Sequence, residues 1–225
     1  KTGGGFWYYY FVSIFYKTPI ACFIFFIWSS ILLVRQRIFK EFIRKEFFLL
    51  APVIYFLLLM SFFYQAQCGI RHIIFIYPFI FILSGTIINH LRSFGARTIV
   101  ILLTIYLLVS TGRYWGNYFP YTNEFISDKK MAYSKVGAFN LEFLQGKYFA
   151  LKYLLEHSEI QWAPKQPRAG RFIINVEDYL DIWNRHEYDW IVKYKPVGHV
   201  AFNFLLIDVE EKNIQTQKPE SSNNK

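Results

Sequence analysis

Four long apolar runs constrain this chain more than any other feature of its sequence. They occupy residues 20–34, 47–64, 73–91 and 98–115, and none of them contains an Asp or a Glu. Crossing a hydrocarbon core of ~30 Å at ~1.5 Å per residue takes an apolar helix of about 20 residues. A soluble domain of 225 residues has no need for four such runs. The sequence therefore predicts an α-helical multi-pass membrane protein with about four transmembrane helices.

The positive charge is concentrated in this membrane half. Residues 1–115 carry eleven Lys or Arg and two acidic residues, whereas residues 116–225 carry fourteen of each. The formal net charge of +9 thus belongs to the membrane half, and it gives no argument for nucleic acid as a partner. Cations between apolar runs indicate topology and contact with the headgroups of membrane lipids.

The loops between the runs predict the orientation. Residues 35–46 hold five cations, and Arg92 and Arg97 flank the loop that follows the third run. Arg71 is the one firm charge between the second and third runs. By the positive-inside rule the loop at 35–46 faces the cytoplasm, so the amino end and the carboxyl-terminal region lie outside.

The remaining segments complete the predicted organisation. Aromatic residues crowd residues 3–16, which is typical of a helix at the membrane interface, and Thr18 and Pro19 predict the start of a new helix. The predicted parts are an outer loop with an interfacial aromatic helix (1–17), a four-span membrane domain (18–115), an extracytoplasmic α/β region (116–211) and a disordered tail (212–225). Because the chain opens on Lys1, we expect it to be the carboxyl-terminal part of a longer protein.

The α/β region is predicted from its local patterns. A helix is expected over residues 142–157, and its apolar stripe comprises Leu141, Leu144, Tyr148, Leu151 and Leu155. Strands are expected over 171–176 and 200–208, with a short helix over 177–186 between them. The acids Glu177, Asp178 and Asp181 are interpreted as the solvated first turns of that helix.

Arg71 and His72 are the first candidate site, at the mouth of the third run. A guanidinium there can bind a phosphate through paired hydrogen bonds in a poorly hydrated place, and His72 can add a hydrogen bond. The structural alternative is an arginine that snorkels to the interface from a helix end.

Further candidates lie near the same predicted outer level. Lys17 is either a ligand of an anionic headgroup or an interfacial anchor, and the aromatic residues 6–10 either shape a lipid-tail groove or form an aromatic belt. Asn123 and Glu124 either position a sugar hydroxyl or a cation such as Arg71, or serve as a loop acid and a helix cap. Arg113, at the end of the fourth run, is interpreted as a snorkelling residue.

Several classes of site have no support in the sequence. Cys22 and Cys68 occupy places too different to suggest a disulfide, and no metal-ligand spacing, glycine-rich phosphate loop or nucleophile elbow is present. No cofactor is evident, and the sequence leaves open whether a divalent metal is needed. Acid-free spans also argue against a proton-coupled transporter.

Several short blocks of this sequence form a recognisable series. They are Gly5–Tyr10 with Lys17-Thr18-Pro19, Gly69-Ile70-Arg71-His72 with Ile76-Tyr77-Pro78-Phe79, Tyr121-Thr122-Asn123-Glu124, Asn140–Gln145, and Tyr194-Lys195-Pro196-Val197. In their order and spacing these blocks resemble the dolichyl-phosphate-mannose–protein mannosyltransferase type of glycosyltransferase, family 39 with a C-type fold. Phe75 replaces the family's usual proline, and the block at 140–145 departs from the family at three positions.

The resemblance implies transfer of a sugar from a polyprenyl-phosphate carrier to a protein or envelope glycan, outside a bacterial inner membrane. It implies that Arg71, Lys17 and His72 bind the lipid phosphate, and that Asn123, Glu124 and Tyr77 position acceptor or donor. The family's catalytic carboxylate lies in an earlier outer loop, so no catalytic residue is expected in this fragment. The rival hypothesis is a non-catalytic membrane scaffold whose outer α/β region binds a partner or an envelope polymer.

Overall fold

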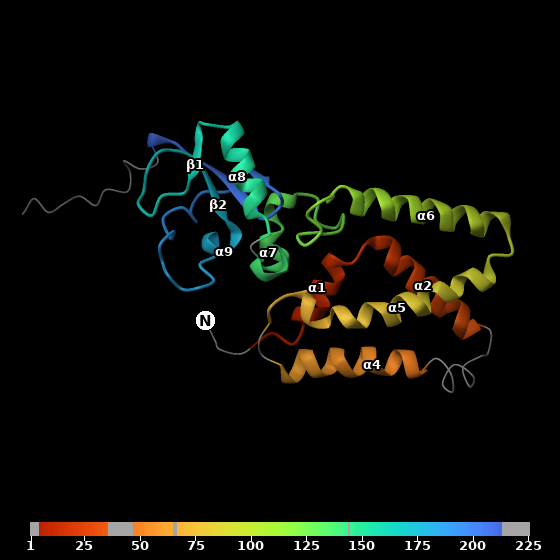
Figure 1. The fold of residues 1–225 in the computed structure, drawn as a ribbon. Helices are drawn as coiled ribbons and strands as arrows, with labels where there is room; N and C mark the ends of the chain where they lie inside the picture. The colour runs from red at the N-terminus through yellow and green to blue at the C-terminus, as the bar shows by residue number, and fades with distance from the viewer. Residues whose placement is uncertain (1–4, 36–46, 65–66, 144, 213–225) are drawn as a thin grey trace, which may run out of the picture. The chain divides into compact units, whose positions relative to one another are not determined.

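The computed structural model describes residues 5–35, 47–64, 67–143 and 145–212, and it divides the chain into two compact units (Figure 1). The first unit is Lys1–Ile126 and the second is Ser127–Lys225. The predicted cationic loop at 36–46, Leu144 of the predicted stripe and the predicted tail from residue 213 onward lie outside the described residues.

The first unit opens with a sharply bent pair of helices, α1 (Tyr9–Lys17) and α2 (Ile20–Arg35). Their axes meet at 105°, and Thr18 between them has an extended backbone with φ −95° and ψ 132°. Proline disfavours helical geometry at the residue before it, which explains why α1 ends at Lys17. The predicted start of a new helix after Thr18 and Pro19 is confirmed.

Among the described residues of the first unit, three further helical segments follow. They are α4 (Phe47–Leu58) continued by the π-helix η1 (Leu59–Phe63), then the 3₁₀-helix η2 (Ile70–Ile76), α5 (Tyr77–Gly85) and the 3₁₀-helix η3 (Thr86–His90) in one run, and finally α6 (Phe94–Gly112). Figure 1 shows α5 between α2 and α4, and α6 contacts α2. The Ser29 hydroxyl of α2 donates to the Ser84 carbonyl of α5 at 2.7 Å, a direct bond between neighbouring helices.

Two of these segments, Ile70–His90 and Phe94–Gly112, are long and apolar enough to cross a membrane. The bent pair makes a third if both of its helices belong to one broken span. Among the described residues, Phe47–Phe63 is a shorter apolar helix, and its 17 residues reach about 26 Å, less than the ~30 Å of a hydrocarbon core. Membrane association is therefore supported, whereas the predicted count of about four spans is not confirmed.

The second unit is built on a four-stranded mixed sheet in the order β1-β2-β4-β3. Its strands are β1 (Ile160–Trp162), β2 (Gly170–Asn175), β3 (Gly198–Val200) and β4 (Phe204–Val209), and only the β1–β2 pair is parallel. The predicted strand at 171–176 corresponds to β2. The predicted strand at 200–208 is instead two strands, because the chain turns at Ala201 and Phe202, which both have positive φ.

The predicted helix at 142–157 is α8 (Lys147–Glu156), and its predicted apolar stripe is wrong. Tyr148, Leu151 and Leu155 are 70%, 44% and 87% exposed. The buried face instead centres on Ala150, which packs with Ile173 and Phe204 of the sheet. Both faces of α8 are apolar, and the small Ala150 side chain allows the closer approach to the sheet.

Short helical turns surround the sheet. They are η4 (Lys129–Met131), α7 (Tyr133–Val136), η5 (Ala138–Asn140) and α9 (Val176–Tyr179). The predicted helix at 177–186 is thus only the four-residue α9, and turns follow it. Glu142 is fully buried and accepts a hydrogen bond from Asn203, next to Gly146, where a side chain would collide with the Asn203 amide.

Replacing Ala201 by glycine is expected to stabilise the β3–β4 hairpin. Ala201 has φ +52°, a left-handed conformation that costs an L-residue about 1 kcal/mol and glycine very little. We expect amide hydrogen exchange in β3 and β4 to slow by about two- to fivefold in Ala201→Gly. The control is Ala150→Gly, in the right-handed helix α8, which should instead speed amide exchange in the second unit. Slower exchange in both variants would contradict the explanation from the left-handed backbone of Ala201.

Candidate functional site

The amino end of α1 is tied to the loop that precedes Arg71. The Phe6 amide donates to Gln67 Oε1 at 3.0 Å, and Gln67 Nε2 donates back to the Phe6 carbonyl at 2.6 Å. The Gly69 amide donates to the Tyr9 hydroxyl at 2.9 Å. These bonds fix the aromatic start of α1 beside the start of η2.

Arg71 and His72 lie in the first turn of η2, directly after Gly69, whose φ of +91° only glycine adopts readily. Both side chains are half-buried, and the His72 ring centroid is 5.8 Å from that of Tyr64. Arg71 therefore lies at the start of a helix and at the boundary between packed and exposed surface, as the sequence predicted.

The other end of α1 carries Lys17 at the helix break. The Lys17 ammonium donates to the Phe119 carbonyl at 2.5 Å and lies 5.4 Å from the centroid of the Phe119 ring. The segment that follows α6 therefore returns to the break and contacts its cation.

Asn123 holds the break together from a position more than a hundred residues away. It is fully buried, and its Nδ2 donates to the carbonyls of Phe15 at 2.5 Å and Thr18 at 2.9 Å. Its backbone amide donates to the Tyr16 carbonyl at 2.8 Å. These carbonyls at the end of α1 lack partners within their own helix, so Asn123 acts as the cap of the broken end.

Tyr77 joins the same cluster through Thr18. The two hydroxyls lie 2.7 Å apart, and the Thr18 carbonyl accepts from Asn123. Tyr9 accepts a hydrogen bond from Gly69, just before η2, and Thr18 bonds to Tyr77, just after η2. Since Tyr9 begins α1 and Thr18 follows its last residue, α1 and η2 run in the same direction. Lys17 is then about 12 Å along α1 from the Tyr9 end, where Arg71 lies.

Glu124 faces α6. Its carboxylate accepts hydrogen bonds from Ser110 Oγ, at 2.5 Å, and from the Tyr106 hydroxyl. The Tyr121 hydroxyl lies 3.0 Å from Ser110 Oγ, and burial raises the pKa of Tyr121 to about 12. Arg113 is exposed just beyond α6.

The structure thus separates the sequence-predicted site residues into three places. Lys17, Tyr77 and Asn123 meet at the helix break, Arg71 and His72 lie at the start of η2, and Glu124 lies against α6. The contacts of Asn123 and Glu124 give each of them a structural task, and their predicted roles towards a sugar stay predictions.

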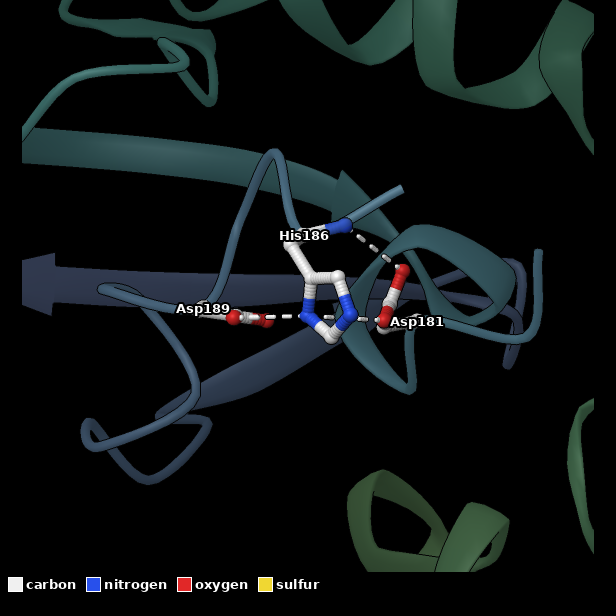
Figure 2. A group of neighbouring side chains, drawn as sticks. All are labelled: Asp181, His186 and Asp189. Carbon is white, nitrogen blue, oxygen red and sulfur yellow. Dashed lines mark hydrogen bonds and ion pairs between the residues drawn. The ribbon is translucent and has the colours of Figure 1, made fainter. Parts of the chain in front are cut away.

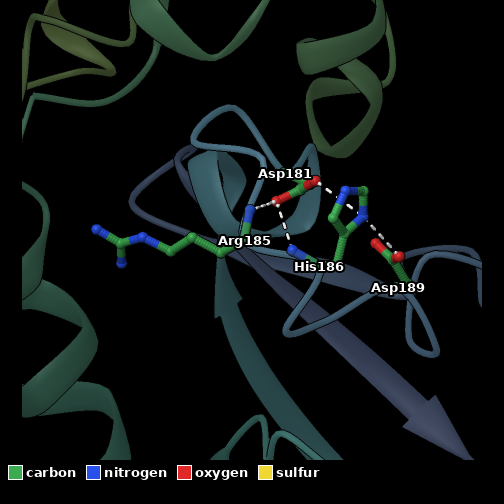
Figure 3. Close-up of polar contacts among 4 residues, drawn as sticks. All are labelled: Asp181, Arg185, His186 and Asp189. Carbon is green, nitrogen blue, oxygen red and sulfur yellow. Dashed lines mark hydrogen bonds and ion pairs between the residues drawn. The ribbon is translucent and has the colours of Figure 1, made fainter.

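The second unit holds a cluster that the sequence interpretation did not identify, in the loop after α9. His186 Nδ1 lies 2.9 Å from Asp189 Oδ2 and 3.5 Å from Asp181 Oδ2, as Figure 2 shows. Asp181 Oδ1 also accepts from the backbone amides of Arg185, at 2.7 Å, and His186, at 3.1 Å (Figure 3). The Asp181 side chain is only 18% exposed, so its prediction as a solvated helix acid is wrong.

This loop depends on left-handed residues. Asp181, Asn184 and His186 have φ of 46°, 53° and 57°, and Asp, Asn and His are the side-chain-bearing residues that best accept such values. The spacing of these three residue types is the signal that could have predicted a tight loop here in place of a helix.

Asp181, His186 and Asp189 each offer one ligand atom, and the three atoms lie within 4.8 Å of one another. They are the described residues best arranged to hold a divalent metal ion. Hydrogen bonding between the imidazole and the two carboxylates explains the same geometry, and the side chains of His186 and Asp189 are about 60% exposed. The cluster by itself assigns no metal.

No protein-family model, no curated protein and no solved structure matches this chain.

Asn123→Ala is expected to open the helix break, because it leaves the Phe15 and Thr18 carbonyls without their side-chain donor. Two unsatisfied buried acceptors cost about 2–4 kcal/mol. Cys22 is buried one turn beyond Pro19 and is a native reporter of this opening. In a Cys68→Ser background we expect a thiol-reactive dye to label Cys22 at least tenfold faster. Glu124→Gln, next along the chain, should change the rate much less, and equal effects would contradict the capping role.

Asp181→Ala is expected to destabilise the loop at 181–189 by about 2 kcal/mol. The substitution removes the acceptor of two backbone amides and places alanine at a left-handed φ. Amide hydrogen exchange at Arg185 and His186 should speed by about tenfold or more. Asp181→Asn keeps an acceptor and tolerates the backbone, so its effect should be less than half as large in free energy.

Proposed function

We propose that this chain is part of a membrane glycosyltransferase that moves a sugar from a polyprenyl-phosphate carrier to a protein or envelope glycan. Arg71 and Lys17 would bind the carrier phosphate, with His72 adding a hydrogen bond. The finer topology belongs to the same proposal: four spans, an extracytoplasmic carboxyl-terminal region and a bacterial inner membrane.

The observation that carries the proposal is the helix break at Lys17, which lies near an apolar hollow along α2. A cavity of about 330 Å³ is lined by α2, α5, η3 and α6, and Cys22 is among its lining residues. Cys22 lies one turn beyond the break that carries Lys17. A cation followed by an apolar space matches a ligand with an anionic head and a hydrocarbon tail.

The half-buried position of Arg71 supports its proposed role. A guanidinium at the start of an apolar helix is less hydrated than one in solvent, and it forms paired hydrogen bonds to phosphate oxygens. Lys17 lies about 12 Å along α1 from the end beside which Arg71 lies. Their backbones are therefore too far apart to flank a single phosphate oxygen. Their long side chains would have to approach the same phosphate from different ends of α1.

In the proposed reaction, the contribution of this chain is a fixed cation that stabilises charge on the leaving phosphate. An acceptor hydroxyl attacks the anomeric carbon of the sugar, the bond from that carbon to the phosphate oxygen breaks, and its electron pair leaves with the phosphate. Arg71 would stabilise the charge that develops there. We propose none of the residues of this chain as the base that takes the hydroxyl proton.

The test is binding of undecaprenyl phosphate to the full chain in lipid nanodiscs, with undecaprenol as the matched lipid without phosphate. Arg71→Ala and Lys17→Met are expected to weaken phosphate-lipid binding by at least tenfold and to leave undecaprenol binding unchanged. Arg97→Ala, an exposed cation at the start of α6, serves as the control and should bind as the wild type does.

A second measurement separates the enzyme from the scaffold. In the full-length protein, Arg71→Ala should reduce sugar transfer from the lipid donor at low donor concentration. Unchanged turnover, or equal binding of the lipid with and without phosphate, would overturn the phosphate role. The non-catalytic scaffold would then be the better account of the first unit.

A further inference from the structure

A hollow in the second unit, lined by both apolar and polar side chains, has a tryptophan as one of its walls. Two adjoining hollows, each of about 160 Å³, share three lining residues, Trp162, Asn175 and Asp178. Trp162 ends β1, an edge strand of the sheet, and it is 43% exposed. An indole offers a wide, rigid apolar face at little cost in conformational entropy, which suits it to bind a ring.

Asn175 provides a hydrogen-bond donor that is held in place. Its Oδ1 accepts from the Glu177 amide at 2.7 Å, which commits the amide oxygen to the start of α9. An asparagine amide also carries two N–H donors. Within the residues that the structure describes, no acceptor takes them.

Asp178 provides the complementary acceptor. Its side chain is half-buried, and no group in the described part of the chain donates a hydrogen bond to its carboxylate. Burial raises the pKa of Asp178, while Arg185 lowers it and Glu187 raises it. A desolvated carboxylate without a donor costs folding free energy, and hydroxyl donors of a ligand would recover that cost.

The charges around the hollow disfavour an anionic ligand. Two carboxylates, Glu142 and Asp178, and one ammonium, Lys147, line one of the two hollows. An anionic ligand would meet the two carboxylates, whereas a neutral ligand with hydroxyl groups and an apolar ring face avoids that repulsion.

We propose that this hollow binds a saccharide, with one sugar ring on the Trp162 face and its hydroxyls bonded to Asp178 and Asn175. A volume of about 160 Å³ corresponds to about five water molecules, which is the scale of a single ring. The inference does not rest on the proposed function, because it concerns the other unit and uses different residues. It holds equally for an enzyme and for a polymer-binding scaffold.

The experiment is saturation-transfer NMR with glucose, mannose, galactose and N-acetylglucosamine. The full chain is held in a phospholipid nanodisc, since many detergents carry sugar headgroups that would compete. At least one of the four sugars is expected to bind, with its ring protons receiving magnetisation. Trp162→Ala should raise the dissociation constant at least tenfold, and Trp162→Phe should raise it less because an aromatic face remains.

The matched control is Trp183→Ala. Trp183 is 56% exposed in the same unit and lines neither of the two hollows. Its substitution should leave sugar binding unchanged. Binding that is equally weakened by both substitutions, or binding of none of the four sugars at 50 mM (roughly the concentration that detects the weakest specific ligands), would overturn the proposal. Binding of tetramethylammonium but of no sugar would also overturn it, in favour of a cation site.

Asp178→Asn gives a readout that a purely structural residue would not give. Since burial disfavours the ionised form of Asp178, the neutral asparagine should raise the unfolding midpoint of the second unit at neutral pH. The same substitution removes the charged acceptor and should weaken sugar binding at least fivefold. A lower unfolding midpoint together with unchanged binding would contradict the role assigned to this carboxylate.

Discussion

The arrangement of the first unit depends on satisfying backbone carbonyls at a helix break. A bend of 105° between α1 and α2 removes the intrahelical partners that a continuous helix would supply. In apolar surroundings each unsatisfied carbonyl is costly, so a donor must come from elsewhere in the chain. Asn123 supplies it, and the segment after α6 must therefore return to the break. Lys17, Thr18 and Tyr77 meet at one place as a result.

In the second unit, backbone groups of an irregular segment are likewise satisfied by one side chain, here the carboxylate of Asp181. Asp181 Oδ1 accepts hydrogen bonds from the backbone amides of Arg185 and His186, which lie in a loop with three left-handed residues and outside any helix or strand. Both units thus rely on one polar side chain that organises irregular backbone. Trp162 at the end of β1 and Asp178 in α9, which line the proposed saccharide site, lie in the same unit as this organised turn.

Hydropathy and proline were enough to predict the apolar helices and the break after Thr18, because both effects act over a few residues. The angle of the break and its cap were not predictable, since Asn123 is 105 residues from Thr18 and no local pattern links them. The buried face of α8 was missed because both faces are apolar and the sheet selects the one with Ala150. The β3–β4 turn was missed because Ala201 and Phe202 are not the residues that usually mark a left-handed turn.

The position of Asn123 along the chain has a consequence for the covalent attachment of the second unit. It lies four residues before the second unit begins at Ser127, so the only covalent path from that unit to α6 passes through the cap of the helix break. Along the chain, Asn123 and its hydrogen bonds to Phe15 and Thr18 therefore come before α6 when the path is followed back from the second unit. The attachment point of the second unit is thus a packed, hydrogen-bonded residue and not the free end of a helix.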